Sequence, residues 1–123
     1  MPSSIVQIKY FKNYVDSEII TFNKTPVERE LISRNILNRA YYSSFLHCRK
    51  KLELDHISDI SIHQDVIDNV SNDLVKRYLI QLLRYRKDAD YKTIYLNKNI
   101  SDLLNVQRIM NYILNLEKKD LIK

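Results

Sequence analysis

The most restrictive feature of this sequence is the complete absence of glycine from its 123 residues, which also include only two prolines. Tight turns and barrel corners depend on glycine, because it adopts positive φ angles without a steric cost. An all-β fold is therefore disfavoured. The glycine-rich phosphate loops of Walker and dinucleotide-binding proteins are excluded outright.

Apolar residues instead recur at steps of three and four along most of the chain, which is the period of an amphipathic helix. The pattern predicts helices over about residues 4–22, 26–52, 62–70, 74–91 and 102–114. No repeat, low-complexity tract or linker divides the chain. We therefore predict an all-α, up-and-down bundle of about five helices that forms a single domain over residues 1–123.

Capping signals support three of these helix starts. Thr25, Pro26 and Glu28 form a predicted capping box, with proline at the first helical position. Ser61 with Gln64 is a weaker box before the third helix, and Ser101 is a predicted cap for the fifth.

Composition limits the environment and the partners. Twenty basic residues against fifteen acidic ones give a net charge of +5, which suits RNA, DNA or an acidic protein but also ordinary solvated helix ends. The single Cys48 cannot form an internal disulfide, and no zinc-type spacing of Cys and His is present. No signal peptide or apolar run of roughly 20 residues is found. We expect a cytoplasmic protein without membrane contact, metal or cofactor.

The stretch over residues 39–52, RAYYSSFLHCRKKL, is expected to organise the bundle. Ala40, Ser44 and Cys48 lie four residues apart, so on a helix these small side chains form one stripe that lets another helix approach closely. The predicted partner is the helix over residues 74–91.

Arg86 is the anomaly in that partner helix. Its spacing places it on the same stripe as Val75, Leu79 and Leu82, where a bundle would normally bury a leucine. A buried guanidinium needs a carboxylate, a partner chain or a water-filled cleft. Asp90, one turn further on, is a candidate partner. The alternative is that Arg86–Asp90 and Arg84–Asp88 are ordinary surface ion pairs.

The segments RAYYSSFLHCRKKL and LLRYRKDADY together resemble the HEPN domains, small prokaryotic helical bundles of toxin–antitoxin and phage-defence systems. The resemblance extends over the whole chain, including a short helix that begins near a histidine, here His63. It implies a homodimer whose cleft, in active members, is a metal-independent ribonuclease site. In that site an arginine holds the phosphate and a histidine moves a proton.

On this resemblance Arg84 and Arg86 match the catalytic arginine, whereas Tyr91 occupies the place of the histidine. Tyrosine has a reference pKa near 10 and is a poor proton shuttle at neutral pH. Asp90 and Tyr91 complete the catalytic candidates, and Tyr91 is also a candidate target of a nucleotidyltransferase antitoxin. The candidate binding residues are Arg39, Tyr42, His47 and Lys87. His47 could in principle face Arg86, but a structural role is favoured for each of His47, His63 and the loop residue His56.

Three hypotheses follow for the function. The first is a ribonuclease toxin or defence effector that grips phosphate with Arg84 and Arg86. The second is a non-catalytic module that binds a nucleotide, RNA or a partner through Tyr42, Arg84, Arg86 and Tyr91, since aromatic and guanidinium planes stack on bases. The third is a structural subunit that docks on another protein of a defence complex.

Overall fold

The computed structural model describes residues 4–20, 26–56, 61–91 and 100–123, and within these ranges it contains helices and no strand. The helices are α1 (Ser4–Ile20), α2 (Pro26–Lys51), α3 (Ile62–Asn69), α4 (Asp73–Tyr91), α5 (Ile100–Leu114) and α6 (Lys118–Leu121). The all-α prediction is confirmed. Five of the six helices match predicted ones, and the four-residue α6 was not predicted.

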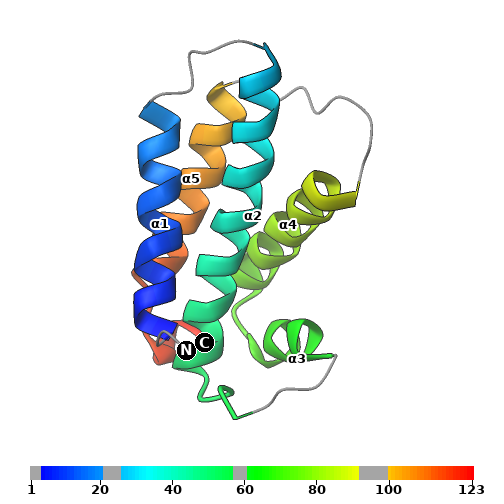
Figure 1. Cartoon of the computed structure of the whole chain (residues 1–123). Helices are drawn as coiled ribbons and strands as arrows, with labels where there is room; N and C mark the ends of the chain where they lie inside the picture. The colour runs from blue at the N-terminus through cyan, green and yellow to red at the C-terminus, as the bar shows by residue number, and fades with distance from the viewer. Residues whose placement is uncertain (1–3, 21–25, 57–60, 92–99) are drawn as a thin grey trace.

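The four longer helices alternate in direction along the chain, as expected for an up-and-down bundle (Figure 1). Helices α1, α2 and α5 run side by side, whereas α4 crosses α2 obliquely and the short α3 lies near the C-terminal end of α2 (Figure 1). Helix α2 contacts each of the other five helices. It is therefore the central element of the fold.

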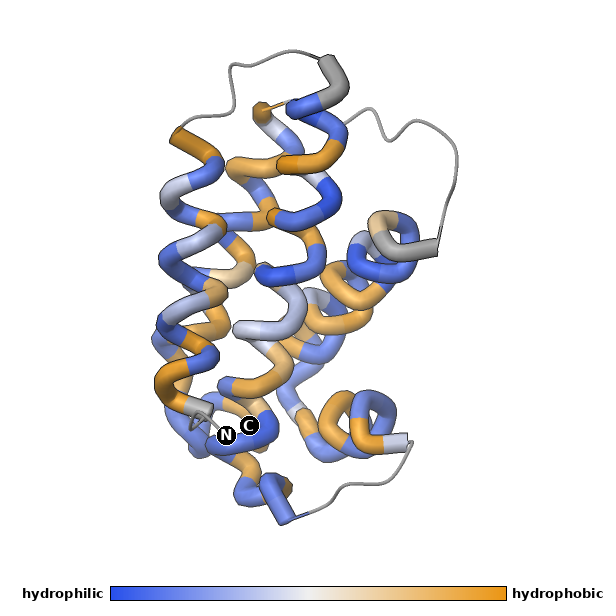
Figure 2. The backbone as a smooth tube through the Cα atoms, viewed as in Figure 1, coloured by the Kyte–Doolittle hydropathy of each residue, from blue (hydrophilic) through white to orange (hydrophobic). Residues whose placement is uncertain are grey.

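The core forms where the apolar stripes of these helices meet, and Figure 2 shows apolar and polar segments alternating along the longer helices. The predicted small-residue stripe of α2 is fully buried, since Ala40, Ser44 and Cys48 have no exposed surface. The buried hydroxyls of Ser43 and Ser44 both donate to the carbonyl of Ala40, at 3.1 and 2.9 Å. These serines therefore remain hydrogen-bonded inside the core.

Both ends of α4 are anchored, which fixes the position of its side chains. The side-chain oxygen of Asn72 accepts the backbone N–H groups of Leu74 and Val75, at 3.1 and 3.3 Å, and so caps the N-terminus. At the other end, Arg34 of α2 donates from Nη1 to the carbonyl of Ala89 at 2.6 Å. This bond ties an otherwise unpaired last-turn carbonyl to α2.

The C-terminus of α2 ends in a turn that usually contains glycine. Glu53 has a φ of 60°, and the N–H groups of Glu53 and Leu54 donate to the carbonyls of Lys50 and Arg49 at 3.1 and 2.9 Å. This is the hydrogen-bond pattern of a Schellman motif. Glu53 therefore occupies a left-handed conformation that costs a residue with a Cβ atom about 1 kcal/mol or more.

The capping predictions have mixed outcomes. Thr25 lies outside the described residues, so its predicted capping box stays a prediction. Ser61 makes no side-chain cap bond and donates to Asp65 at 3.2 Å, while Gln64 bonds Asp68 rather than completing a box. The predicted cap at Ser101 is wrong, because α5 already begins at Ile100. No helix in the described ranges is both long and apolar enough to cross a membrane.

Candidate functional site

Arg86 lies on the inner face of α4, about three, two and one turns beyond the fully buried Val75, Leu79 and Leu82. Its side chain is half-buried and points to α2, where Nη2 donates to the hydroxyl of Tyr42 at 2.9 Å. The guanidinium carbon lies 5.2 Å from the centre of the Tyr42 ring. The structure thus brings together the anomalous arginine and the second tyrosine of the Arg-Ala-Tyr-Tyr segment.

Three more aromatic rings extend this contact into a cluster. His63, from the first turn of α3, stacks on Phe45 with centroids 4.3 Å apart and an interplanar angle of 26°. It also lies 5.6 Å from the Tyr41 ring and 6.0 Å from the Tyr42 ring. We name Tyr41, Tyr42, Phe45, His63 and Arg86 the Arg86–His63 site. Its members come from α2, α3 and α4.

A hydrogen bond joins the deepest residue of this site to its histidine. The Tyr41 hydroxyl lies 2.7 Å from Nδ1 of His63. Tyr41 has no exposed surface, and burial raises the pKa of its hydroxyl far above the ordinary range, an effect that the nearby Arg86 offsets only in part. The hydroxyl therefore stays protonated and acts as a neutral hydrogen-bonding group.

The charges around His63 are positive. Burial lowers the pKa of His63 below its ordinary value of 6.5, and the cationic Arg86, Arg49 and Lys87 lower it further. At neutral pH the site therefore holds an uncharged imidazole beside a guanidinium. Such an arrangement suits an anion, because the guanidinium is positively charged and a neutral imidazole can donate a hydrogen bond to an anionic oxygen.

Arg84 and Lys87 lie at different distances from this site. Two residues along a helix correspond to a rotation of about 200°, so Arg84 lies on the face of α4 opposite to Arg86. There it lines a surface hollow with Arg77, Ile80, Gln81, Tyr85 and Asp88. Lys87 is exposed but close enough to His63 to influence its pKa. Of these two predicted residues, only Lys87 borders the Arg86–His63 site.

Arg39 and His47 belong to other surfaces of α2. The guanidinium of Arg39 lies 5.1 Å from the Tyr14 ring of α1, and its Nη1 donates to Asn35 at 3.3 Å. Nε2 of His47 lies 2.9 Å from the carbonyl of Leu116. Among the contacts of the described residues, none joins either side chain to Arg86. The histidine beside Arg86 is His63, which the sequence interpretation had assigned to capping or packing.

Asp90 and Tyr91 form the last turn of α4 by their backbone, but their side chains lie outside the described part of the structure. The predicted ion pair between Arg86 and Asp90 therefore stays a prediction, as does any role of the Tyr91 hydroxyl. The Ala89 carbonyl just before them is the one held by Arg34.

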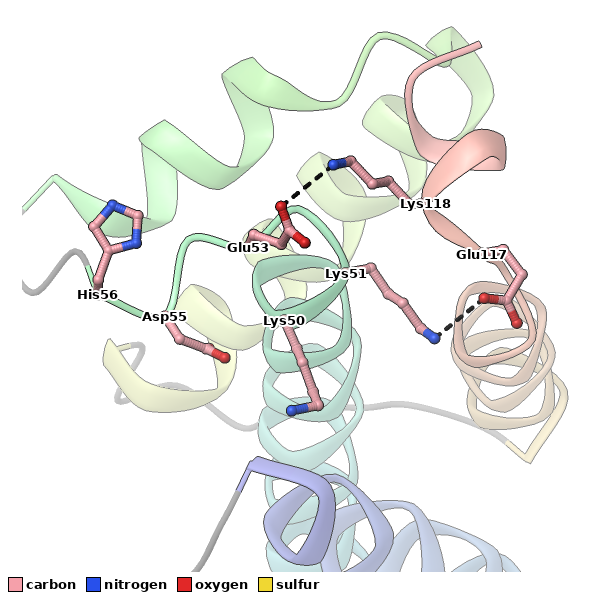
Figure 3. A pocket seen from close by; sticks show the side chains of 7 residues that line it. All are labelled: Lys50, Lys51, Glu53, Asp55, His56, Glu117 and Lys118. Atoms are coloured by element: carbon pink, nitrogen blue, oxygen red, sulfur yellow. Dashed lines mark hydrogen bonds and ion pairs between the residues drawn. The ribbon is translucent and has the colours of Figure 1, made fainter.

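A second surface hollow lies between the C-terminal end of α2 and α6 (Figure 3). Three lysines and three carboxylates line it together with His56, and two pairs are close: Lys51–Glu117 at 3.2 Å and Lys118–Glu53 at 3.4 Å. Their opposite charges largely cancel, so this hollow carries little net charge. In the described ranges no group of three or more His, Cys, Asp or Glu side chains is placed to hold a metal ion.

Comparison of the chain with models of known protein families found no match, and searches of the curated proteins and of the solved structures found none either.

Proposed function

We propose that this chain is a HEPN-like protein of a prokaryotic toxin–antitoxin or antiviral defence system that binds RNA, with an RNA phosphate at the Arg86–His63 site. The observation that carries the proposal is the placement of the Arg86 guanidinium and the neutral His63 imidazole against the same tyrosine, Tyr42. The Arg-Ala-Tyr-Tyr and Ala-Asp-Tyr segments that resemble the HEPN domains lie on α2 and α4, two of the three helices that form the site.

Two properties of the site favour RNA over a small inorganic anion. Arg86 and Lys87 supply positive charge, with Arg49 nearby on α2, which suits a phosphate backbone. Tyr42 and His63 are half-buried rather than fully covered, so each retains some accessible surface. Unstacked RNA bases bind to such aromatic surfaces and to guanidinium planes.

The binding test compares two arginines on opposite faces of one helix. Arg86→Ala is expected to weaken binding of single-stranded RNA about tenfold or more, because a charge-assisted hydrogen bond to phosphate contributes roughly 1.5–3 kcal/mol. Arg84→Ala removes the same charge outside the site and is expected to change the affinity far less. Equal losses in the two variants would show that binding follows net charge and would contradict the proposed site.

A second candidate function is metal-independent cleavage of the bound RNA, and the position of His63 favours it. In this reaction the ribose 2′-oxygen attacks phosphorus and loses its proton to a base. The bond to the 5′-oxygen breaks, that oxygen takes a proton from an acid, and a 2′,3′-cyclic phosphate forms. His63 could serve one of these two proton transfers. A second copy of the chain, as predicted for a homodimer, would have to supply the other group.

Incubation with RNA in EDTA separates the two candidates. Cleavage that yields cyclic-phosphate ends and is lost in His63→Gln, which retains a side-chain N–H donor, while RNA binding persists, would establish the enzyme. Binding without turnover by the unaltered protein would establish the non-catalytic module.

The predicted partners belong to the same proposal. A homodimer is tested by light scattering of the purified protein. Modification of Tyr91 by a nucleotidyltransferase antitoxin is tested by mass spectrometry after co-expression with a nucleotidyltransferase encoded beside the gene. A monomeric protein would count against the homodimer only. An unmodified Tyr91 would count against the nucleotidyltransferase partner only.

A further inference from the structure

We propose that Tyr41 is a positioning residue that keeps the proton of neutral His63 on Nε2, so that His63 presents an N–H donor beside the Arg86 guanidinium. The role of this donor toward an RNA phosphate rests on the proposed function. The assignment of the proton does not, and can be measured on the free protein.

The argument begins with the hydrogen bond between the two residues. Tyr41 is fully buried, and the only hydrogen bond of its hydroxyl among the described residues is the 2.7 Å contact with Nδ1 of His63. If Nδ1 carried the proton, it would donate to the tyrosine oxygen. The hydroxyl proton would then be buried without an acceptor, an arrangement that folded proteins avoid.

The opposite arrangement satisfies both groups. The Tyr41 hydroxyl donates to an unprotonated Nδ1, and the single proton of the neutral ring resides on Nε2. The Nε2 atom has no hydrogen-bond partner among the residues that the structure describes. It is therefore available to a ligand, because His63 is only half-buried.

The packing of the ring opposes an exchange of the two nitrogens by rotation. The His63 ring lies nearly parallel to the rings of Phe45 and Tyr41, with centroids 4.3 and 5.6 Å away. The Tyr42 ring is inclined to it by 76°, with its centroid 6.0 Å away. A ring held in this way keeps Nδ1 at the Tyr41 hydroxyl and Nε2 on the other edge.

The charged neighbours act in the same direction. Burial is the main cause that lowers the pKa of His63, and the positive charges of Arg86 and Lys87 on α4 and Arg49 on α2 lower it further. An imidazolium is therefore disfavoured. A neutral ring with an Nε2–H group remains compatible with these cations and can donate to an anionic oxygen that they attract.

The first experiment records the imidazole nitrogen signals of His63 by ¹⁵N NMR in the free protein at neutral pH. The expected signature is a protonated Nε2 and a hydrogen-bonded, unprotonated Nδ1. A proton on Nδ1 would overturn the assignment of Tyr41, whether or not the protein binds RNA.

A matched pair of tyrosine variants tests the cause. Tyr41→Phe is expected to move the Nδ1 signal to that of an unbonded nitrogen, since it removes the donor and retains the ring. Tyr42→Phe removes the neighbouring hydroxyl, which bonds Arg86 instead, and is expected to leave the Nδ1 signal in place. If the Nδ1 signal changed equally in the two variants, the change would reflect a general disturbance of the site, and the proposal would be contradicted. Circular dichroism confirms that each variant is folded.

The second experiment asks whether the donor contributes to binding, with a short 2′-O-methylated RNA as the probe so that cleavage is blocked. His63→Gln retains a side-chain N–H donor and is expected to bind within about threefold of the unaltered protein. His63→Leu lacks a donor and is expected to lose about tenfold or more. Equal loss in both variants would overturn the donor role. Absence of RNA binding by the unaltered protein would contradict the proposed function and leave the NMR result on Tyr41 standing.

Discussion

The Arg86 guanidinium of α4 donates to the Tyr42 hydroxyl of α2 at 2.9 Å, and this bond links the two helices at the place where a leucine would otherwise fill the interface. Tyr42 also contacts Phe11 of α1, with ring centroids 6.4 Å apart. A single half-buried tyrosine thus connects α1, α2 and α4. The arginine is held by this contact in a defined orientation, which a binding residue requires.

Removal of the Tyr42 hydroxyl should therefore have a measurable cost. Tyr42→Phe retains the aromatic packing and is expected to lower the free energy of unfolding by about 1 kcal/mol, because it removes one charge-assisted hydrogen bond of Arg86. Urea denaturation measures this change. Tyr78→Phe is the control, since the half-buried Tyr78 hydroxyl makes no hydrogen bond in the described structure. Equal effects in the two variants would mean that the Arg86–Tyr42 bond contributes nothing.

Stability should also depend on pH through two histidines. Burial is the main cause that lowers the pKa of both His47 and His63 below 6.5 in the folded protein. As pH falls below 6.5, the unfolded chain binds these protons first, so the free energy of unfolding decreases. The decrease is at most about 1.4 kcal/mol per pH unit for each histidine.

Urea unfolding between about pH 7.5 and about pH 5 measures this slope. A variant that combines His47→Gln and His63→Gln should show a shallower slope than the unaltered protein. His56→Gln, at an exposed position, is the control and should not change the slope of the free energy of unfolding against pH. A double variant with an unchanged slope would show that neither histidine is responsible.

The turn after α2 offers a stability test in a chain without glycine. Glu53→Gly should be more stable than Glu53→Ala by about 1 kcal/mol, because alanine retains the Cβ atom that disfavours the φ of 60°. Both variants lose the exposed contact with Lys118, so that contact cancels in the comparison. Thermal or urea unfolding gives the difference. Equal stabilities would show that the left-handed conformation carries no cost here.

Cys48 should be chemically inert in the folded protein. It is fully buried, and burial raises the pKa of its thiol to about 12, so the reactive thiolate is scarce at neutral pH. Iodoacetamide is expected to label Cys48 only after unfolding in urea, as followed by mass spectrometry. Rapid labelling of the native protein would contradict the packing of this part of α2.

Helical periodicity predicted much of this structure because it determines which residues share a face. Val75, Leu79, Leu82 and Arg86 repeat at steps of three and four, and that spacing alone placed Arg86 against a neighbouring helix. The same geometry separates Arg84 from Arg86 by about 200°, a distinction that the family resemblance does not make.

The position of His63 could not be predicted in the same way. It depends on the path of the chain between α2 and α3, and no periodic pattern specifies how a short helix returns to its neighbour. Its place at the beginning of a helix favoured capping or packing. The signal that could have revealed it is the family's short helix beginning near a histidine, combined with the expected position of the Arg-Ala-Tyr-Tyr segment. The four-residue α6 is too short to produce a periodic pattern.

The central claim, that RNA binds at the Arg86–His63 site, is tested most directly by NMR titration of the isotope-labelled protein with a short 2′-O-methylated RNA. The account predicts that the side-chain signals of Arg86 and His63 shift together and saturate, whereas those of Arg77 and Arg84 on the opposite face of α4 change little. Shifts confined to Arg77 and Arg84, or to the hollow around Lys50 and Lys118, would contradict it.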